Sequence, residues 1–221
     1  LSVRPFRADT SLSCSHPLLT VTGARTHAEL RGASCLPLSL MAPTRQGISV
    51  TRTFGSAIES WADLREAVCA YAARAAEKLR DEGLMAGRLA VFAHTNPHNG
   101  DPWHSAHRAA EIEPTADSGA LIQECIRLLR ACWRPGFRYS KAGVMLQELT
   151  PAGRQAALFS TRDAAKSAAA MQAMDAINKR FGRETLRIAS TGNSRPWRAR
   201  QQQLSPRYTT RADELLSAKA F

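Results

Sequence analysis

Apolar and polar residues alternate most clearly between residues 48 and 54 of this 221-residue chain. Ile48 and Val50 fall on one face of an extended segment, whereas the other face carries Ser49, Thr51 and Thr53. This period of two predicts a half-buried strand. Less regular alternation predicts three more strands, over residues 88–95, 104–112 and 137–149.

Apolar residues at helical spacing predict two long helices. The first begins after Ser60, which forms a capping-box-like pair with Asp63, and it ends near Gly83. Its apolar stripe consists of Trp61, Leu64, Val68, Ala72, Ala75 and Leu79. The second helix begins near Asp117 or Ser118 and ends before Pro135. Its apolar residues are Leu121, Cys125, Leu128 and Cys132, with Ile122, Leu129 and Trp133 beside them.

Shorter or more distant elements flank this central part. A short helix is predicted around Ala28 to Leu30, and a longer one over residues 163–181, ended by Gly182. The longer helix carries an apolar stripe of Met171, Met174, Ile177 and Phe181. A short strand is predicted over residues 185–189.

The predicted order over residues 48–150 is β-α-β-β-α-β, an α+β fold with a small helical and irregular C-terminal extension. Two helices would cover one face of a four-stranded sheet and leave the other face free. The free face is predicted to carry Thr51, Thr53, His94, Tyr139 and Lys141. Hydroxyl and ammonium groups suit contacts with a phosphate backbone. A merely solvated face is the alternative.

The charge balance favours a polyanionic partner. The chain has 30 Lys and Arg against 19 Asp and Glu, a formal net charge of +11. Such an excess attracts nucleic acid, although it can also serve solubility alone. No apolar run approaches the roughly 18 residues of a membrane span, and no secretion signal opens the chain. We therefore expect a cytoplasmic protein without membrane contact.

The cysteine and histidine residues do not form a recognisable metal motif. The five cysteines show no CxxC spacing, and Cys69, Cys125 and Cys132 fall at apolar helix positions, which predicts reduced core thiols. A zinc site is the alternative. Four histidines lie in and around one loop without credible ligand spacing: His94, His98, His104 and His107. We expect no metal site and no catalytic residue in this chain.

A short peptide after the last predicted strand has the composition of a docking segment. Gln155 precedes two alanines and the adjacent apolar pair Leu158-Phe159, in a polar linker. Large apolar side chains without a local core can fill the pocket of a partner protein. Farther on, residues 190–197 and 204–211 mix Arg, Pro and aromatic residues. Their pattern fits either a phosphate-binding extension or a protein-docking patch.

Several segments, in order, resemble the C-terminal half of UmuC-type Y-family translesion DNA polymerases, the catalytic subunits of DNA polymerase V. Residues 29–38 resemble the end of the thumb, and Thr51-Arg-Thr-Phe-Gly55 resembles the first strand of the little finger domain. Later signatures are Thr95-Asn-Pro97 and Tyr139-Ser-Lys-Ala-Gly-Val-Met145. Three further segments resemble the C-terminal domain of the family: Asn178-Lys-Arg-Phe-Gly182, Arg195-Pro-Trp197 and residues 204–211.

The resemblance implies a domain division and a role in SOS mutagenesis and DNA repair. The divisions are an unmatched leader (1–24), a thumb remnant and linker (25–47), the little finger (48–150), a linker with a clamp-binding peptide (151–165) and the C-terminal domain (166–221). The little finger of this family holds primer–template DNA largely through phosphates. The implied DNA-binding residues are Thr51, Arg52, Thr53, His94, Tyr139 and Lys141.

The resemblance also implies partners. Gln155, Leu158 and Phe159 resemble the pentapeptide that docks such polymerases on the sliding clamp, although Ala156 stands where the pattern often has Leu. UmuD′ and the RecA filament are the other implied partners. The unmatched leader and the start at Leu1 fit a truncated or split reading frame.

The palm domain of the family, with its paired metal-binding carboxylates, has no counterpart in the resemblance. Two-metal phosphoryl transfer needs acidic residues that bring two cations within about 4 Å of each other. We therefore expect Mg²⁺ only in a palm domain outside this chain, and no polymerisation by this chain alone. Two hypotheses remain: a DNA-binding and clamp-docking module, or a protein-interaction module with an incidental basic surface.

Overall fold

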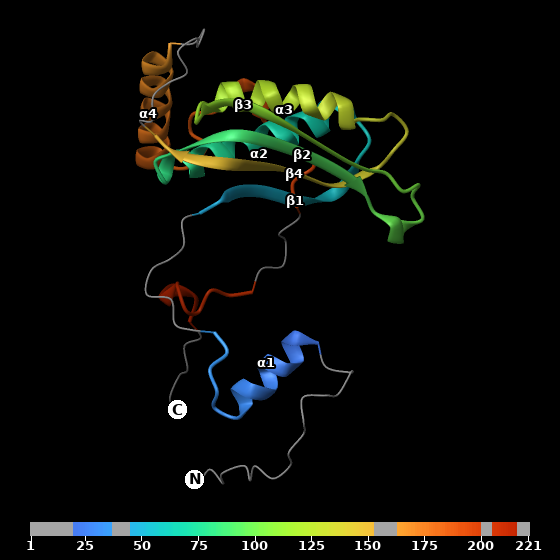
Figure 1. The fold of residues 1–221 in the computed structure, drawn as a ribbon. Coiled ribbons are helices and arrows are strands. Elements are labelled where there is room, and N and C mark those ends of the chain that lie inside the picture. Colours follow the sequence, from blue (N-terminus) through green and yellow to red (C-terminus); the bar gives the residue numbers. More distant parts are fainter. Residues whose placement is uncertain (1–19, 37–44, 153–162, 200–204, 216–221) are drawn as a thin grey trace, which may run out of the picture. The chain divides into compact units, whose positions relative to one another are not determined.

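The structure is a computed structural model, and it describes residues 20–36, 45–152, 163–199 and 205–215 (Figure 1). The chain divides into two compact units, Leu1–Thr44 and Arg45–Phe221. The described part of the first unit contains α1 (Val21–Leu30). This helix begins earlier than the short helix predicted around Ala28. In the second unit, residues 45–199 carry the sheet and the candidate sites.

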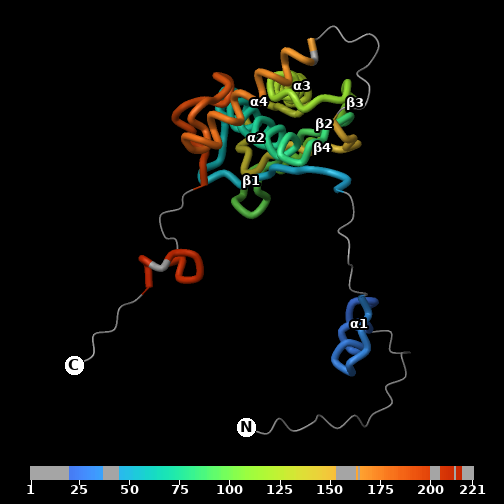
Figure 2. The backbone as a smooth tube through the Cα atoms, turned by 90° about the vertical axis from the view of Figure 1, so that its left-hand side faces the viewer, coloured from blue at the N-terminus to red at the C-terminus, as the bar shows by residue number. Residues whose placement is uncertain are grey.

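The centre of the second unit is a four-stranded antiparallel sheet with the strand order β1-β4-β2-β3. Its strands are β1 (Gly47–Ile58), β2 (Leu84–Thr95), β3 (Ser105–Thr115) and β4 (Tyr139–Pro151). The two helices α2 (Trp61–Asp81) and α3 (Ser118–Cys132) lie on the same side of this sheet (Figures 1 and 2). The predicted α+β fold and the order β-α-β-β-α-β are confirmed.

The core fills the space between the sheet and these two helices. In the sheet, Val50, Val144 and Val91 form one buried row across β1, β4 and β2. The predicted stripes of both helices face it: the fully buried leucines include Leu64, Leu79, Leu121 and Leu129. Alternation places Ile48 and Val50 inside and leaves Ser49 exposed, as predicted.

The predicted helix caps form because short polar side chains satisfy the first free backbone N–H groups. The Ala62 backbone N–H donates to the Ser60 hydroxyl oxygen at 3.1 Å. The Ala120 backbone N–H donates to the Asp117 carboxylate at 2.7 Å. Gly83 adopts a φ of +64° directly after α2, where a glycine meets no steric penalty.

Cys69, Cys125 and Cys132 are buried free thiols, as predicted. Burial raises the pKa of all three, so the thiols are protonated and pack as small apolar groups. In the described part of the chain, no group of His, Cys, Asp and Glu is arranged to hold a metal ion. None of the described helices is long and apolar enough to cross a membrane.

A fourth helix, α4 (Ala164–Phe181), packs beside the sheet through polar contacts. The Arg80 guanidinium forms a two-pronged ion pair with Asp175 at 2.6 and 2.7 Å, and the Ser167 hydroxyl donates to Asp117. The apolar stripe predicted for this helix is only partly covered: Met171 and Met174 are half-buried, whereas Ile177 and Phe181 are 37% and 64% exposed. Polar anchoring thus replaces the expected apolar face.

The prediction of a strand over residues 185–189 is wrong. The segment forms turns followed by the short 3₁₀ helix η2 (Ala189–Thr191). The Asn178 side chain both accepts from the Leu186 backbone N–H and donates to its carbonyl, at 2.8 and 3.0 Å. A local side chain therefore takes the hydrogen bonds that a neighbouring strand would have made. The other short 3₁₀ helices are η1 (Pro97–Asn99) and η3 (Ala212–Glu214).

Trp197 fastens the segment that follows η2 to the sheet unit. Its indole is 5% exposed and packs edge-on against Tyr71 and Phe54, with ring centroids 5.7 and 6.4 Å apart. The indole N–H donates to the Glu66 carboxylate at 3.1 Å, and the Trp197 carbonyl accepts from the Gly55 N–H. Residues 163–199 are therefore part of the same folded body as the sheet.

Candidate nucleic-acid interface

The face of the sheet opposite α2 and α3 carries polar residues in rows that cross all four strands. The first row is Thr53, Lys141, His94 and Ser105, which pair in register from β1 through β4 and β2 to β3. Neighbouring strands lie about 4.8 Å apart, so such a row presents its side chains side by side. The row places two hydroxyl groups, an ammonium group and an imidazole on one surface. We call this surface the open face.

The second row of the open face is Thr51, Gly143, Phe92 and His107. The Phe92 ring lies directly over Gly143. A Cβ atom added at this glycine would come within 2.6 Å of the ring. Glycine therefore lets an aromatic ring lie flat over the middle of the sheet. Phe92 and Gly143 escaped the sequence reasoning, which considered only polar residues on this face.

His94 is held in place by its neighbours on this surface. Its imidazole stacks on Phe92 with centroids 4.9 Å apart, and its Nδ1 lies 3.4 Å from the Ser105 hydroxyl. Burial lowers the pKa of His94, and the positive charge of Lys141 lowers it further. The imidazole is therefore neutral at pH 7, and Lys141 supplies the positive charge of the row.

Tyr139 does not lie on the open face, which corrects its predicted placement. Its side chain is fully buried, and its phenol oxygen accepts from the Arg134 backbone N–H at 2.9 Å and lies 3.2 Å from the His104 imidazole. The register shifts between His94 and Thr95, so that Lys141 pairs with His94 and Tyr139 with Thr95. This irregularity turns Tyr139 toward the helices, although it has the same parity as Lys141.

Arg52 also lies off the open face. It follows Val50 by two residues on β1, so its side chain points to the same side of the sheet as the buried Val50. Its side chain is exposed at the outer strand β1, on the side of the sheet that faces α2. There it lines a cavity of about 610 Å³. The other walls of this cavity come from α2, α4 and residues 183–199.

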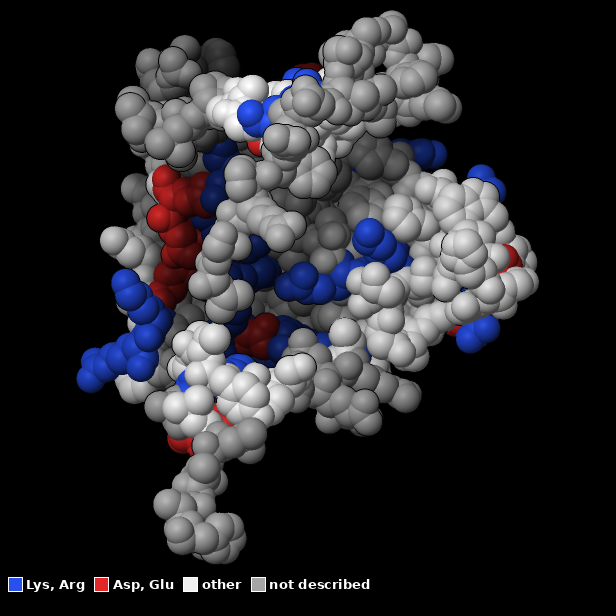
Figure 3. All heavy atoms as spheres, turned by 90° about the horizontal axis from the view of Figure 1, so that it is seen from below, with Lys and Arg blue, Asp and Glu red and all other residues white. Residues whose placement is uncertain are grey.

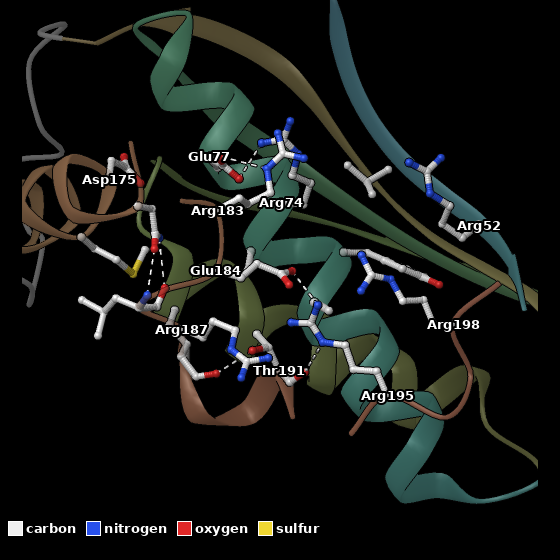
Figure 4. Close-up of a pocket in the computed structure, with 18 of the residues that line it drawn as sticks. Arg52, Arg74, Glu77, Asp175, Arg183, Glu184, Arg187, Thr191, Arg195 and Arg198 are labelled. Carbon is white, nitrogen blue, oxygen red and sulfur yellow. Dashed lines mark hydrogen bonds and ion pairs between the residues drawn. The ribbon is translucent and has the colours of Figure 1, made fainter. Parts of the chain in front are cut away.

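Arginine dominates the lining of this cavity, which we call the arginine cavity (Figure 4). The lining arginines are Arg52, Arg74, Arg80, Arg183, Arg187, Arg195 and Arg198, against the carboxylates Glu77, Asp175 and Glu184. In the view from below Figure 1, Lys and Arg side chains gather across the middle of the molecular surface (Figure 3). The cavity brings together the strand residue Arg52 and the C-terminal Arg195, which the sequence analysis did not connect.

The predicted clamp-binding residues Gln155, Leu158 and Phe159 lie outside the described residues. Their role stays a prediction. Of the predicted DNA-binding residues, the structure brings Thr51, Thr53, His94 and Lys141 together on the open face. Arg52 and Tyr139 lie elsewhere, for the reasons of parity and register given above.

Comparison with known proteins places this chain among proteins of one family. Residues 45–158 match the C-terminal domain of the impB/mucB/samB family. Residues 168–218 match a domain of unknown function, DUF4113. The first match ends in the linker after β4, and the second contains most of α4 and the Trp197 segment.

The chain is similar to several curated proteins along most of its length. It is 40% identical to protein UmuC of Salmonella typhimurium over 199 residues, which is 88% of this chain and 47% of that protein. It is 40% identical to protein MucB of Escherichia coli over 207 residues, which is 92% of this chain and 48% of that protein. The chain therefore spans about half the length of these relatives. Because the family model covers more than half of the chain, this protein belongs to the impB/mucB/samB family.

Proposed function

We propose that this chain is the DNA-binding and clamp-docking C-terminal part of a UmuC-like, error-prone translesion DNA polymerase that acts in SOS DNA repair in the cytoplasm. Family membership supports the general assignment. The observation that carries DNA binding is the row of Thr53, Lys141 and His94 across the sheet face opposite α2 and α3, in a chain with a net charge of +11.

The open face suits contact with a sugar–phosphate backbone rather than with base edges. Thr51 and Thr53 offer hydroxyl donors, and Lys141 offers an ammonium group between β1 and β2. Such groups position a duplex without reading its sequence. Sequence-independent binding is what a polymerase needs, because it must hold every primer–template that it extends.

The test is the affinity for a fluorescently labelled primer–template DNA, measured by anisotropy between about 50 and 200 mM NaCl. If binding runs through phosphates, the logarithm of the binding constant should fall linearly with the logarithm of the salt concentration. The slope should become shallower by about 0.9 for each phosphate contact that a variant loses. The double variant Thr53→Ala/Lys141→Ala should show a weaker affinity and a shallower slope. Lys179→Ala, an exposed lysine of α4, is the matched control. Unchanged binding by the double variant would contradict the role of the open face.

Clamp docking is proposed on the peptide that contains Gln155, Leu158 and Phe159. A polymerase tethered to a sliding clamp stays at a high effective concentration near the primer end. The double variant Leu158→Ala/Phe159→Ala should lose clamp binding in surface plasmon resonance while its DNA affinity stays unchanged. Equal clamp binding by this variant and the wild-type chain would show that the peptide does not dock on the clamp. UmuD′ and the RecA filament are proposed as further partners and can be measured on the same surface.

We also propose that the chain does not polymerise by itself, because its resemblance covers the little finger and the C-terminal domain and not the palm. Primer extension with Mg²⁺ and the four deoxynucleoside triphosphates should give no product. Extension by the purified chain would overturn this part of the proposal.

A protein-interaction module is the second candidate, favoured by the exposed apolar residues Ile177 and Phe181 of α4. On this hypothesis the chain binds UmuD′, the RecA filament or the clamp and has little DNA affinity of its own. Binding to one of these proteins that survives Thr53→Ala/Lys141→Ala but not Ile177→Ser/Phe181→Ser, together with negligible DNA affinity, would favour it over the first candidate.

A further inference from the structure

The arginine cavity contains positive charge that the described residues do not neutralise. Arg74, Arg80, Arg183 and Arg195 each pair with a lining carboxylate. In contrast, Arg52, Arg187 and Arg198 form no ion pair with any described residue, and all three are exposed. Seven guanidinium groups against three carboxylates leave an excess of positive charge around one hollow, which attracts an anion more strongly than the same groups dispersed over a surface.

The inner wall of the cavity is held rigidly. The Arg195 side chain is only 10% exposed; it donates to Glu184 at 2.5 Å and to the Thr191 carbonyl at 3.3 Å. Glu184 and Arg195 both have positive φ values, +67° and +43°, which non-glycine residues rarely adopt. Such strained positions persist only where the surrounding contacts enforce them, and they concentrate at functional sites.

The mouth of the cavity is partly ordered as well. The Arg187 guanidinium donates to the Gly192 carbonyl at 3.2 Å and to the Asn193 side chain at 3.1 Å. These bonds fix the position of the guanidinium, and neither acceptor carries a charge. Figure 4 shows Arg52 on β1 and Arg187, Arg195 and Arg198 on the C-terminal segment around the same cavity.

We propose that the arginine cavity binds a backbone phosphate of the nucleic acid strand that leaves the open face over the β1 edge. The inference deepens the proposed function and rests on it. Guanidinium groups match phosphate oxygens with paired, charge-assisted hydrogen bonds. Arg52 and Arg198 supply the contact, and Arg195 shapes the inner wall.

Continuity with the open face favours nucleic acid over an acidic peptide. Arg52 lies on β1 between Thr51 and Thr53, whose side chains belong to the open face, and β1 is an outer strand of the sheet. On this proposal, a strand that crosses the open face and passes this edge reaches Arg52, whose side chain is exposed on the outer strand β1. The proposed site therefore joins the sheet domain to the DUF4113 segment in a single DNA-binding surface.

The test compares variants of the full chain by DNA anisotropy across salt concentrations. Arg52→Ala/Arg198→Ala should weaken primer–template binding and make the salt slope shallower by about 0.9, since the loss of one phosphate contact changes the slope by about 0.9. Arg130→Ala, an exposed arginine of α3 outside the cavity, controls for a general loss of charge. Thermal unfolding of each variant verifies that the fold is intact.

The outcomes separate this inference from the proposed function. If Thr53→Ala/Lys141→Ala weakens binding but Arg52→Ala/Arg198→Ala binds as the wild type does, the cavity is not a phosphate site and the open face still is. If only the arginine variant weakens binding, the cavity site stands and the role of the open face fails. If a polyglutamate peptide binds the chain in an Arg52- and Arg198-dependent way while DNA does not, the cavity takes an acidic peptide and the inference is overturned.

Discussion

The two faces of one four-stranded sheet have opposite characters. The covered face carries the apolar row of Val50, Val144 and Val91, with both helices packed on it. The open face of the same strands carries the row of Thr53, Lys141 and His94. Because successive residues of a strand point to opposite faces, one stretch of chain holds both the stabilising and the proposed binding surface.

This contrast separates stability from binding at the level of single residues. Substitutions on the covered face should change the free energy of unfolding and leave DNA affinity alone, whereas substitutions on the open face should do the reverse. The arginine cavity lies on the side of the sheet that faces α2, with Val50 and Arg52 of β1 among its lining residues. Single substitutions on each face therefore test whether stability and binding are separate.

The largest effect is expected from Trp197→Ala, because this indole fills the end of the covered face against Phe54 and Tyr71. Removing a buried tryptophan side chain should lower the free energy of unfolding by about 3–5 kcal/mol, measured by urea denaturation. The control is Trp103→Ala, whose side chain is 61% exposed and should cost far less. Equal losses for the two variants would show that the C-terminal segment is not fastened through Trp197.

Tyr139→Phe should have the next largest effect on stability and none on DNA affinity. The change removes the phenol oxygen that accepts from the half-buried Arg134 backbone N–H, which should cost about 0.5–1.5 kcal/mol of unfolding free energy. Tyr208→Phe, at a residue that is 44% exposed, is the control. A loss of DNA affinity with unchanged stability would instead restore Tyr139 to the binding surface.

Thr53→Val tests the open face without changing the shape of the side chain. Loss of the hydroxyl should remove one hydrogen bond to phosphate, about 0.5–1.5 kcal/mol, and so weaken DNA binding roughly two- to tenfold. Anisotropy measures the affinity, and denaturation should show almost unchanged stability. Thr26→Val in α1 is the control outside the sheet. If stability falls and affinity does not, Thr53 has a structural role only.

The smallest effect is expected from pH. The pKa of His94 lies below its usual value of 6.5 because of burial and the charge of Lys141. Lowering the pH from about 8 through the folded-state pKa of His94 should protonate it and strengthen DNA binding by a few-fold. His94→Gln should lose this increment, whereas His98→Gln should keep it. An increment that persists in His94→Gln would show that His94 is not its source.

The same acidification should lower the free energy of unfolding, even though it strengthens DNA binding. A histidine whose pKa is lower in the folded state binds protons more readily in the unfolded state. Its contribution to stability is complete above pH 6.5 and is lost as the pH falls toward the folded-state pKa. Burial also lowers the pKa of His104, so both groups contribute to this loss. Denaturation at each pH separates the change in folding from the change in DNA affinity.

Sequence periodicity predicted the elements with the strongest local signals. The period of two in residues 48–54 identified β1, and the stripe from Leu64 to Leu79 identified α2. Capping at Ser60 and Asp117 placed the starts of both covering helices. The period failed at residues 185–189, where the Asn178 side chain takes the hydrogen bonds of Leu186.

The α+β order and the apolar side of each strand and helix could be read from local sequence patterns, because they depend on residues close together in the chain, and the positive charge follows from composition. Which side chains share a surface depends on the three-dimensional packing instead. The register shift beside Thr95 buries Tyr139 while leaving Lys141 on the open face, and a pattern within one strand cannot reveal it. The arginine cavity likewise brings Arg52 next to residues more than a hundred positions later. Such proximity arises from long-range packing of Trp197 and α4 and not from local sequence periodicity.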